Sequence, residues 1–192
     1  MAVICFAAFA DSRNRHRVVL KVVLKAESKE QPKAKLLLLF ASIAVATLAT
    51  AQLIGYAVYS AIPENSTVVV NSLIHFTHIR NHGGVFGMLQ GSGWLFALIS
   101  ALLLAGVTAY LALGEEIQRY EYVCFGFIVG GGASNVLDRL IYGSVIDFID
   151  IQHIPYWNYV FNTADVMVHV GIWPMLLLGL LAGRREQTGA ST

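Results

Sequence analysis

The stretch LLLLFASIAVATLATAQLIGYAVYSA, residues 36–61, contains no charged residue. A helix that crosses a bilayer needs about 20 mostly apolar residues, so this stretch is long enough to span a membrane. Further apolar runs lie at residues 93–113, 122–137 and 166–183. The last two reach the required length if DRLIY extends the third run and FNTAD begins the fourth. The sequence therefore predicts an all-α membrane protein with four transmembrane helices.

The composition agrees with a chain whose solvent is largely lipid. Hydrophobic residues make up 56% of the 192 positions and charged residues 13%, whereas soluble domains carry roughly 25% charged residues. The mean hydropathy is +0.62. Cys5 and Cys124 lie far apart without CxxC or CxxH spacing, so neither a disulfide nor a zinc site is expected. The net charge of +1 gives no indication of a nucleic-acid partner.

The charge distribution predicts the orientation and the division of the chain. Residues 1–35 hold eight of the thirteen Lys and Arg residues, at four-residue spacing between Arg13 and Lys33. This segment is interpreted as a surface helix on anionic lipid, a solvated basic arm, or translation from a start codon upstream of the true one. Basic loops stay in the cytoplasm. We therefore expect a cytoplasmic extension at 1–35, a transmembrane domain at 36–182 and a cytoplasmic tail at 183–192.

With both termini inside, two loops lie outside, at residues 62–92 and 143–165. The first is rich in Val, Ile, Phe and Thr with partial alternation, which predicts short strands. In the third apolar run, Gly126 and Gly130 are four positions apart, followed by GGAS. Small residues at this spacing let two transmembrane helices approach closely, so these glycines are expected at helix contacts.

Polar side chains gather at the predicted outer ends of the third and fourth runs. They are Asn135, Asp138, Arg139, Asp147, Asn162 and Asp165. A purely structural interpretation remains open for each group: an ion pair between Asp138 and Arg139, a helix cap formed by Asn162 and Asp165, and a solvated Asp147.

A second interpretation is catalytic, because ionisable groups at membrane depth are costly and are candidates for function. Two carboxylates in a poorly hydrated site share one proton. One can then act as base on a water molecule while the other protonates a substrate carbonyl, which is aspartic peptidase chemistry without metal or cofactor. Asp150 is interpreted as a solvated or loop-capping residue and His169 as a packed, hydrogen-bonded one. The spacing of His75, His78 and His82 in a strand-like segment does not predict a metal site.

Three motifs together resemble lipoprotein signal peptidase, also called signal peptidase II. They are FTHIRNHGGVFGML, GGGASNVLDRLIYGSVIDFIDI and VFNTAD, and the resemblance covers roughly residues 36–181. The resemblance implies four transmembrane helices with a small outer β-cradle. One departure is visible in the first run, where Ala51 and Gly55 stand at positions at which the family usually has Asp and Lys.

The resemblance also implies a function. The family removes signal peptides from prolipoproteins in the bacterial inner membrane, cutting before a diacylglyceryl-modified cysteine at the outer face. Asp147 and Asp165 match the catalytic aspartates. Positions that line the site or contact substrate are matched by Asn81, Gly83, Asn135, Asp138, Arg139 and Asn162. The expected partners are prolipoproteins and membrane lipid, with no cofactor, metal or nucleic acid, and no oligomer is predicted. The alternative is a non-enzymatic membrane protein, either an ion-linked permeation unit or an inactive relative that binds lipoproteins.

Overall fold

The computed structural model describes residues 32–84, 88–157 and 159–189. The chain divides into two units, Met1–Lys33 and Ala34–Thr192, and the second unit holds the sheet and nearly all of the helices described below. The interpretations of the basic stripe concern residues that lie mostly outside the described ones. The proposed division at residues 35 and 182 stays a prediction.

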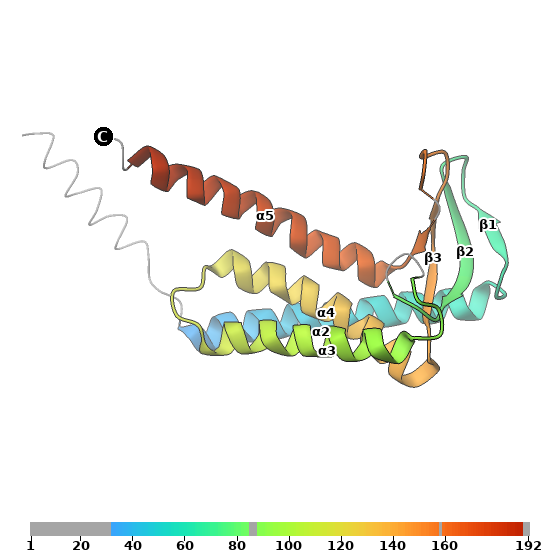
Figure 1. Cartoon of the computed structure of the whole chain (residues 1–192), viewed down its shortest axis with the longest axis horizontal. Coiled ribbons are helices and arrows are strands. Elements are labelled where there is room, and N and C mark those ends of the chain that lie inside the picture. The colour runs from blue at the N-terminus through green and yellow to red at the C-terminus, as the bar shows by residue number, and fades with distance from the viewer. Residues whose placement is uncertain (1–31, 85–87, 158, 190–192) are drawn as a thin grey trace, which may run out of the picture. The chain divides into compact units, whose positions relative to one another are not determined.

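Four long helices account for most of the second unit (Figure 1). They are α2 (Lys33–Ala61), α3 (Gly93–Leu113), α4 (Arg119–Tyr142) and α5 (Thr163–Gly189). Among the described residues, three helical segments are long and apolar enough to cross a membrane: α2, α3 and residues 163–181 of α5. Helix α4 is also long, but it carries more polar residues, and its membrane crossing stays a prediction.

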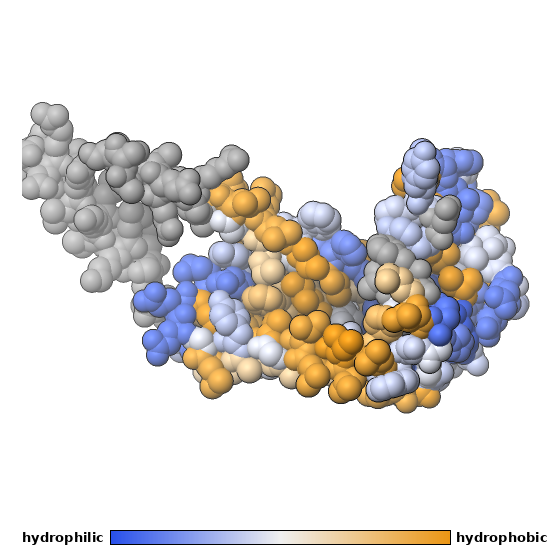
Figure 2. Space-filling view, in the orientation of Figure 1, coloured by the Kyte–Doolittle hydropathy of each residue, from blue (hydrophilic) through white to orange (hydrophobic). Residues whose placement is uncertain are grey.

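The outer surfaces of the helices are apolar. Large side chains such as Leu38, Leu53 and Leu103 are each more than 65% exposed. Figure 2 shows a broad apolar zone over the helices, with polar surface at both ends of this zone, one of them around the sheet. Apolar surface of this extent is typical of contact with lipid or a partner rather than with water. The surface therefore agrees with a membrane-embedded protein.

Helix α4 is the central helix, and its glycines allow the others to approach it. A methyl group added to Gly130 would collide with the Ala44 carbonyl and the Thr47 side chain of α2. A methyl group on Gly131 would collide with the Ala164 carbonyl of α5. Gly126 also abuts α2, through Ile43 and the Phe40 carbonyl. The predicted role of these small residues in helix contact is confirmed.

Replacing Gly130 by Leu is expected to lower the unfolding temperature of the purified protein in detergent. The added side chain has no room against α2, and overpacking of this kind costs about 1–3 kcal/mol of unfolding free energy. Gly106→Leu is the matched control, because a Cβ at Gly106 on α3 meets nothing within 4 Å. Equal unfolding temperatures for the two variants would contradict the close packing of α2 and α4.

A small antiparallel sheet lies at one end of the helices (Figure 1). Its strands, in order across the sheet, are β1 (Thr67–Val69), β2 (Ile74–Asn81), β3 (Val145–Ile151) and β4 (Val160–Phe161). The prediction of short strands in the loop after α2 is confirmed. Strands β3 and β4 were not predicted, although VIDFIDI is rich in β-branched residues, which favour strands.

The sheet reaches the helix ends through tight connections. Helix α4 ends at Tyr142 and is capped by Gly143, whose φ of 68° lies in the left-handed region that glycine tolerates, and β3 begins two residues after this glycine. Strand β2 pairs with β3 so that Ile79 faces Asp147 and Asn81 faces Val145. These connections bring β2, β3 and the ends of α4 and α5 together, and the candidate site lies where they meet.

Candidate active site

Asp147 is buried in the middle strands of the sheet. It lies on β3 with 4% of its surface exposed. Its Oδ2 accepts a hydrogen bond of 3.0 Å from Asn81 Nδ2 of the neighbouring strand β2. Its Oδ1 accepts one of 2.7 Å from Asn162 Nδ2. Two amide donors thus hold both carboxylate oxygens, and the interpretation of Asp147 as a solvated residue is wrong.

Asp165 lies in the first turn of α5. The backbone N–H of Asn162 donates to Asp165 Oδ2 at 3.2 Å, and the backbone N–H of Asp165 donates to Asn162 Oδ1 at 3.0 Å. This reciprocal pair caps the helix, as one of the structural interpretations predicted. Asp165 Oδ1 also accepts a hydrogen bond of 2.8 Å from Asn135 Nδ2 of α4. The cap therefore leaves Asp165 linked to the polar residues of α4.

Asn162 connects the two aspartates. It is 5% exposed, and it bonds Asp147 through its side-chain amide and Asp165 through its backbone. The same Nδ2 donates to Asn135 Oδ1 at 3.2 Å. One residue between β4 and α5 thus sets the orientation of a carboxylate on the sheet relative to one on a helix.

Arg139 ties the loop after β2 to α4. Its Nη2 donates to the Gly83 carbonyl at 2.9 Å and its Nη1 to the Asn135 carbonyl at 3.0 Å. The backbone N–H of Gly83 donates to Asn81 Oδ1 at 3.0 Å, which orients the amide that holds Asp147. The positively charged guanidinium therefore joins this loop to α4 beside the two carboxylates.

Seven of the eight residues predicted for the site belong to this one hydrogen-bond network. They are Asn81, Gly83, Asn135, Arg139, Asp147, Asn162 and Asp165. Asp138 lies apart, since its carboxylate accepts a bond of 2.7 Å from Gln52 of α2. Among the described residues, Asp138 and Arg139 form no ion pair, so that structural interpretation is wrong.

Two glutamines support the site and were not predicted. Gln52 bonds Asp138 and, at 2.9 Å, Ser134 Oγ, which fastens α2 to α4. Gln90 accepts a hydrogen bond of 3.2 Å from the His82 backbone N–H, and its Nε2 donates one of 3.4 Å to Asn81 Oδ1. Gln52 could have been identified from the sequence, because an amide inside a long apolar run needs a buried hydrogen-bond partner.

The other polar residues singled out in the sequence have separate partners. Asp150 accepts a hydrogen bond of 2.9 Å from Thr77 Oγ1 across the β2–β3 pair. His78 is 1% exposed and donates from Nδ1 to the Ile62 carbonyl at 2.6 Å. His169 Nδ1 bonds the Asp165 carbonyl at 2.8 Å, as expected, but its side chain is exposed rather than packed. Within the described ranges no three His, Cys, Asp or Glu residues gather in a metal-binding group.

The surroundings of Asp147 favour its neutral form. The pKa of this carboxyl is raised from 3.8 to about 7, chiefly by burial and next by the negative charge of Asp165. The bonds from Asn162 and Asn81 and the charge of Arg139 act in the opposite direction. A carboxyl that holds a proton near neutral pH, beside a second carboxylate, is suited to acid–base chemistry.

Comparison with known proteins identifies a family that matches most of this chain. Residues 43–181 match the family described as signal peptidase (SPase) II. A protein of Syntrophomonas wolfei subsp. wolfei named "Lipoprotein signal peptidase" is 37% identical over 131 residues, covering 68% of this chain and 85% of the relative. A protein of the same name from Desulfitobacterium hafniense is 34% identical over 125 residues, covering 64% and 79%.

Two solved structures, each described as a bacterial membrane enzyme, have the same fold. Their TM-scores are 0.66 and 0.65 at 24% identity, and the alignments cover 74% of this chain and 87% and 92% of the solved chains. The family match covers most of this chain and includes both aspartates and all of their hydrogen-bond partners. We conclude that the chain belongs to the signal peptidase II family.

Proposed function

We propose that this protein is an aspartic endopeptidase that removes the signal peptide from diacylglyceryl-modified prolipoproteins, cutting before the lipidated cysteine. Family membership and the name of the relatives support a lipoprotein signal peptidase. The observation that carries the catalytic assignment is the connection of Asp147 and Asp165 through Asn162. We assign the catalytic roles to these two aspartates.

The two carboxylates have different environments, which divides the roles between them. Asp165 sits at the N-terminus of α5, where the helix dipole stabilises negative charge. Asp147 lies on the sheet, and burial favours its protonated form. Asp165 therefore takes a proton from the attacking water, while Asp147 gives its proton to the oxygen of the scissile carbonyl. The tetrahedral intermediate then collapses: Asp165 gives the proton taken from water to the departing amine, and a hydroxyl of the intermediate returns a proton to Asp147 as the carbonyl re-forms.

The remaining network residues orient the dyad. Asn81, Asn135 and Asn162 supply amide donors to carboxylate oxygens, so they hold the planes of both groups during the reaction. Arg139 supplies positive charge that offsets the charge of the monoanionic dyad. Asp138, predicted as a site residue, supports α4 from the side of α2 in this proposal.

The location at the end of the helices suits a substrate that is itself partly in lipid. A signal helix and two acyl chains can reach the dyad laterally through the bilayer, and water can reach it from the polar surface around the sheet. We propose that this end faces the outside of the bacterial inner membrane, with both termini in the cytoplasm, as the distribution of basic residues favours.

Reconstitution with a defined substrate tests the proposal. The purified protein in lipid micelles is mixed with a precursor carrying a diacylglyceryl cysteine, and mass spectrometry locates the cut. We expect one new N-terminus at the modified cysteine, and no comparable cleavage of the same precursor without the lipid. An intact lipidated precursor after prolonged incubation would favour the non-enzymatic alternative.

The pH dependence of cleavage follows from the pKa of Asp147, which is raised to about 7 by burial and by the charge of Asp165. The proposed mechanism needs this proton. Above pH 7, kcat/KM is therefore expected to fall about tenfold per pH unit as the dyad loses it. Initial rates measured between pH 6 and 9 check the slope. A rate that stays level across this range would contradict the role of Asp147 as proton donor.

A further inference from the structure

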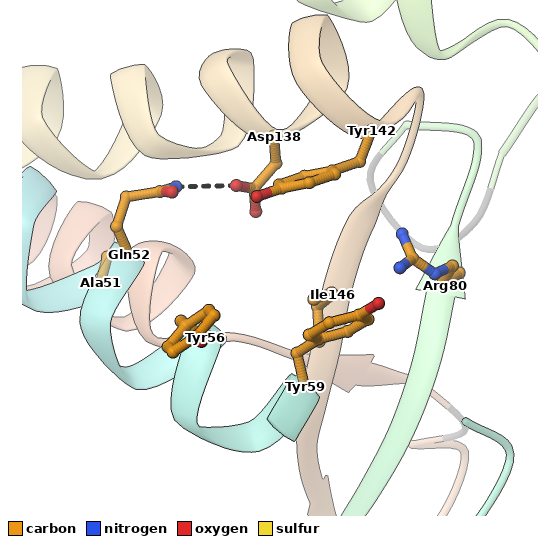
Figure 3. Close-up of a pocket in the computed structure, with 9 residues that line it drawn as sticks. Ala51, Gln52, Tyr56, Tyr59, Arg80, Asp138, Tyr142 and Ile146 are labelled. Carbon is orange, nitrogen blue, oxygen red and sulfur yellow. Dashed lines mark hydrogen bonds between the residues drawn. The ribbon is translucent and has the colours of Figure 1, made fainter. Parts of the chain in front are cut away.

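A pocket separate from the two aspartates lies between α2 and α4, where these helices reach the sheet (Figure 3). Its volume is about 100 Å³, and neither Asp147 nor Asp165 lines it. Asp138 and Tyr142 enter it from α4, Tyr56 and Tyr59 from α2, and Arg80 from β2. None of these five side chains belongs to the hydrogen-bond network around the dyad.

Asp138 is the one carboxylate among the described residues that line the pocket, and no Lys or Arg nitrogen of the described residues lies within 4 Å of it. Asp138 accepts a hydrogen bond from Gln52 and retains further acceptor positions. Arg80 lines the same pocket, and its Nε lies 3.3 Å from Glu64 Oε2. The pocket lining therefore offers one carboxylate and one guanidinium, which suits a ligand that carries both a positive and a negative group.

Aromatic rings surround this carboxylate. Figure 3 shows the Tyr142 ring beside Asp138, with the rings of Tyr56 and Tyr59 on the facing side of the pocket. Tyr59 already carries a cation on its ring, since the Arg80 guanidinium lies 5.5 Å from the ring centroid. Several aromatic rings around a carboxylate are the arrangement that binds alkylammonium groups, through attraction of the cation to the π-faces.

The pocket has room for such a group and opens at the protein surface. A Cβ added to Gly55 meets nothing within 4 Å, so the wall of α2 is set back here. Tyr56 is 69% exposed and Tyr142 is 54% exposed. Exposed tyrosines at the ends of membrane helices lie at the level of lipid headgroups. A headgroup can therefore reach the pocket directly from the bilayer.

We infer that this pocket binds the alkylammonium headgroup of a zwitterionic phospholipid. The ammonium lies against Asp138 and the tyrosine rings. The attached phosphate lies toward Arg80, whose guanidinium uses Nε for Glu64 and Nη1 for Ser144 and has further N–H donors. This inference does not depend on the proposed peptidase activity, because headgroup binding is measured without substrate.

Lipid retention in native mass spectrometry tests the inference. The full-length protein is equilibrated in micelles with equal amounts of dioleoyl phosphatidylethanolamine and dioleoyl phosphatidylglycerol. We expect about tenfold preferential retention of the ethanolamine lipid. Tyr56→Leu and Asp138→Asn are each expected to reduce the ratio toward one. Tyr156→Leu is the matched control, because Tyr156 is 99% exposed in a loop outside the pocket, and it is expected to keep the wild-type ratio.

Two substitutions at Gly55 distinguish the effect of a positive charge in the pocket from the effect of filling the pocket. Gly55→Lys places a tethered ammonium in the pocket, so it is expected to remove the lipid preference and to raise the unfolding temperature. Gly55→Met fills similar space without charge, so it is expected to remove the preference without that rise. Equal retention of the two lipids by the wild type would overturn the inference, as would a preference that persists in both Tyr56→Leu and Gly55→Lys. Binding of free ethanolamine without any lipid preference would overturn the assignment to a lipid.

Discussion

Replacing Asp147 or Asp165 by Asn is expected to lower kcat for cleavage of a lipidated precursor by at least about a thousandfold. An amide can neither take up a proton from water nor donate one as an acid, and positioned acid–base groups contribute about 10²–10⁴ in rate each. The two losses are not expected to add in the double variant, because both residues act in a single step. Single-turnover cleavage followed by mass spectrometry measures the effect.

Asp150→Asn is the matched control for this prediction. It makes the same chemical change on the same strand, but Asp150 is bonded to Thr77 rather than to the dyad. Its kcat is expected to stay within about threefold of the wild type, since the change leaves the dyad network intact. The unfolding temperatures of all three variants show whether each remains folded. Full activity in either dyad variant, or an inactive but folded Asp150→Asn, would contradict the catalytic assignment.

Replacing Asn162 by Ala is expected to reduce both activity and stability. The change removes the amide that bonds Asp147 at 2.7 Å and the oxygen that accepts the Asp165 backbone N–H at 3.0 Å. Loss of a helix N-cap costs about 0.5–2 kcal/mol of unfolding free energy. Loss of the donor to Asp147 leaves a buried carboxyl without one of its two partners, and we expect kcat to fall by roughly a hundredfold.

Asn162→Ser separates these two effects. Serine caps helices about as well as asparagine, so the unfolding temperature is expected to recover most of the loss seen with alanine. Its shorter side chain has no amide to donate to Asp147, so kcat is expected to stay low. Recovery of activity together with stability would show that Asn162 serves only as a cap, and that the orientation of Asp147 depends on other residues.

Most of the helices and most of the residues of the candidate site were predicted from the sequence. Apolar runs at residues 36–61 and 93–113 correspond closely to α2 and α3, because lipid demands continuous apolar surface along a helix, which leaves a long local signal. The motif residues were also sufficient to name seven members of the polar network. Each motif lies at a helix end or on a strand beside one, so its spacing along the chain was informative.

Long-range contacts account for what was not predicted. Asn81 and Asp147 are 66 positions apart, and they meet because β2 pairs with β3 in a register that shifts between Phe76 and Ile79. Strand β3 was expected to be loop, since seven residues carry too weak a local pattern to compete with neighbouring turn signals. Asp138 was expected with the dyad, but one helical position separates it from Arg139 by about 100°, and that rotation turns it toward α2.

Membrane helices, the glycine contacts and the identity of the acidic and amide residues were therefore encoded locally, as runs and short spacings of residue types. The orientation of each carboxylate, the capping contact that connects the dyad and the tyrosine-lined pocket beside Gly55 arose when distant segments met. The hydropathy of a segment depends on its own residues alone, so a membrane helix can be recognised from the sequence of that segment. Hydrogen-bond geometry depends on the mutual placement of several segments, and no single one of them contains it.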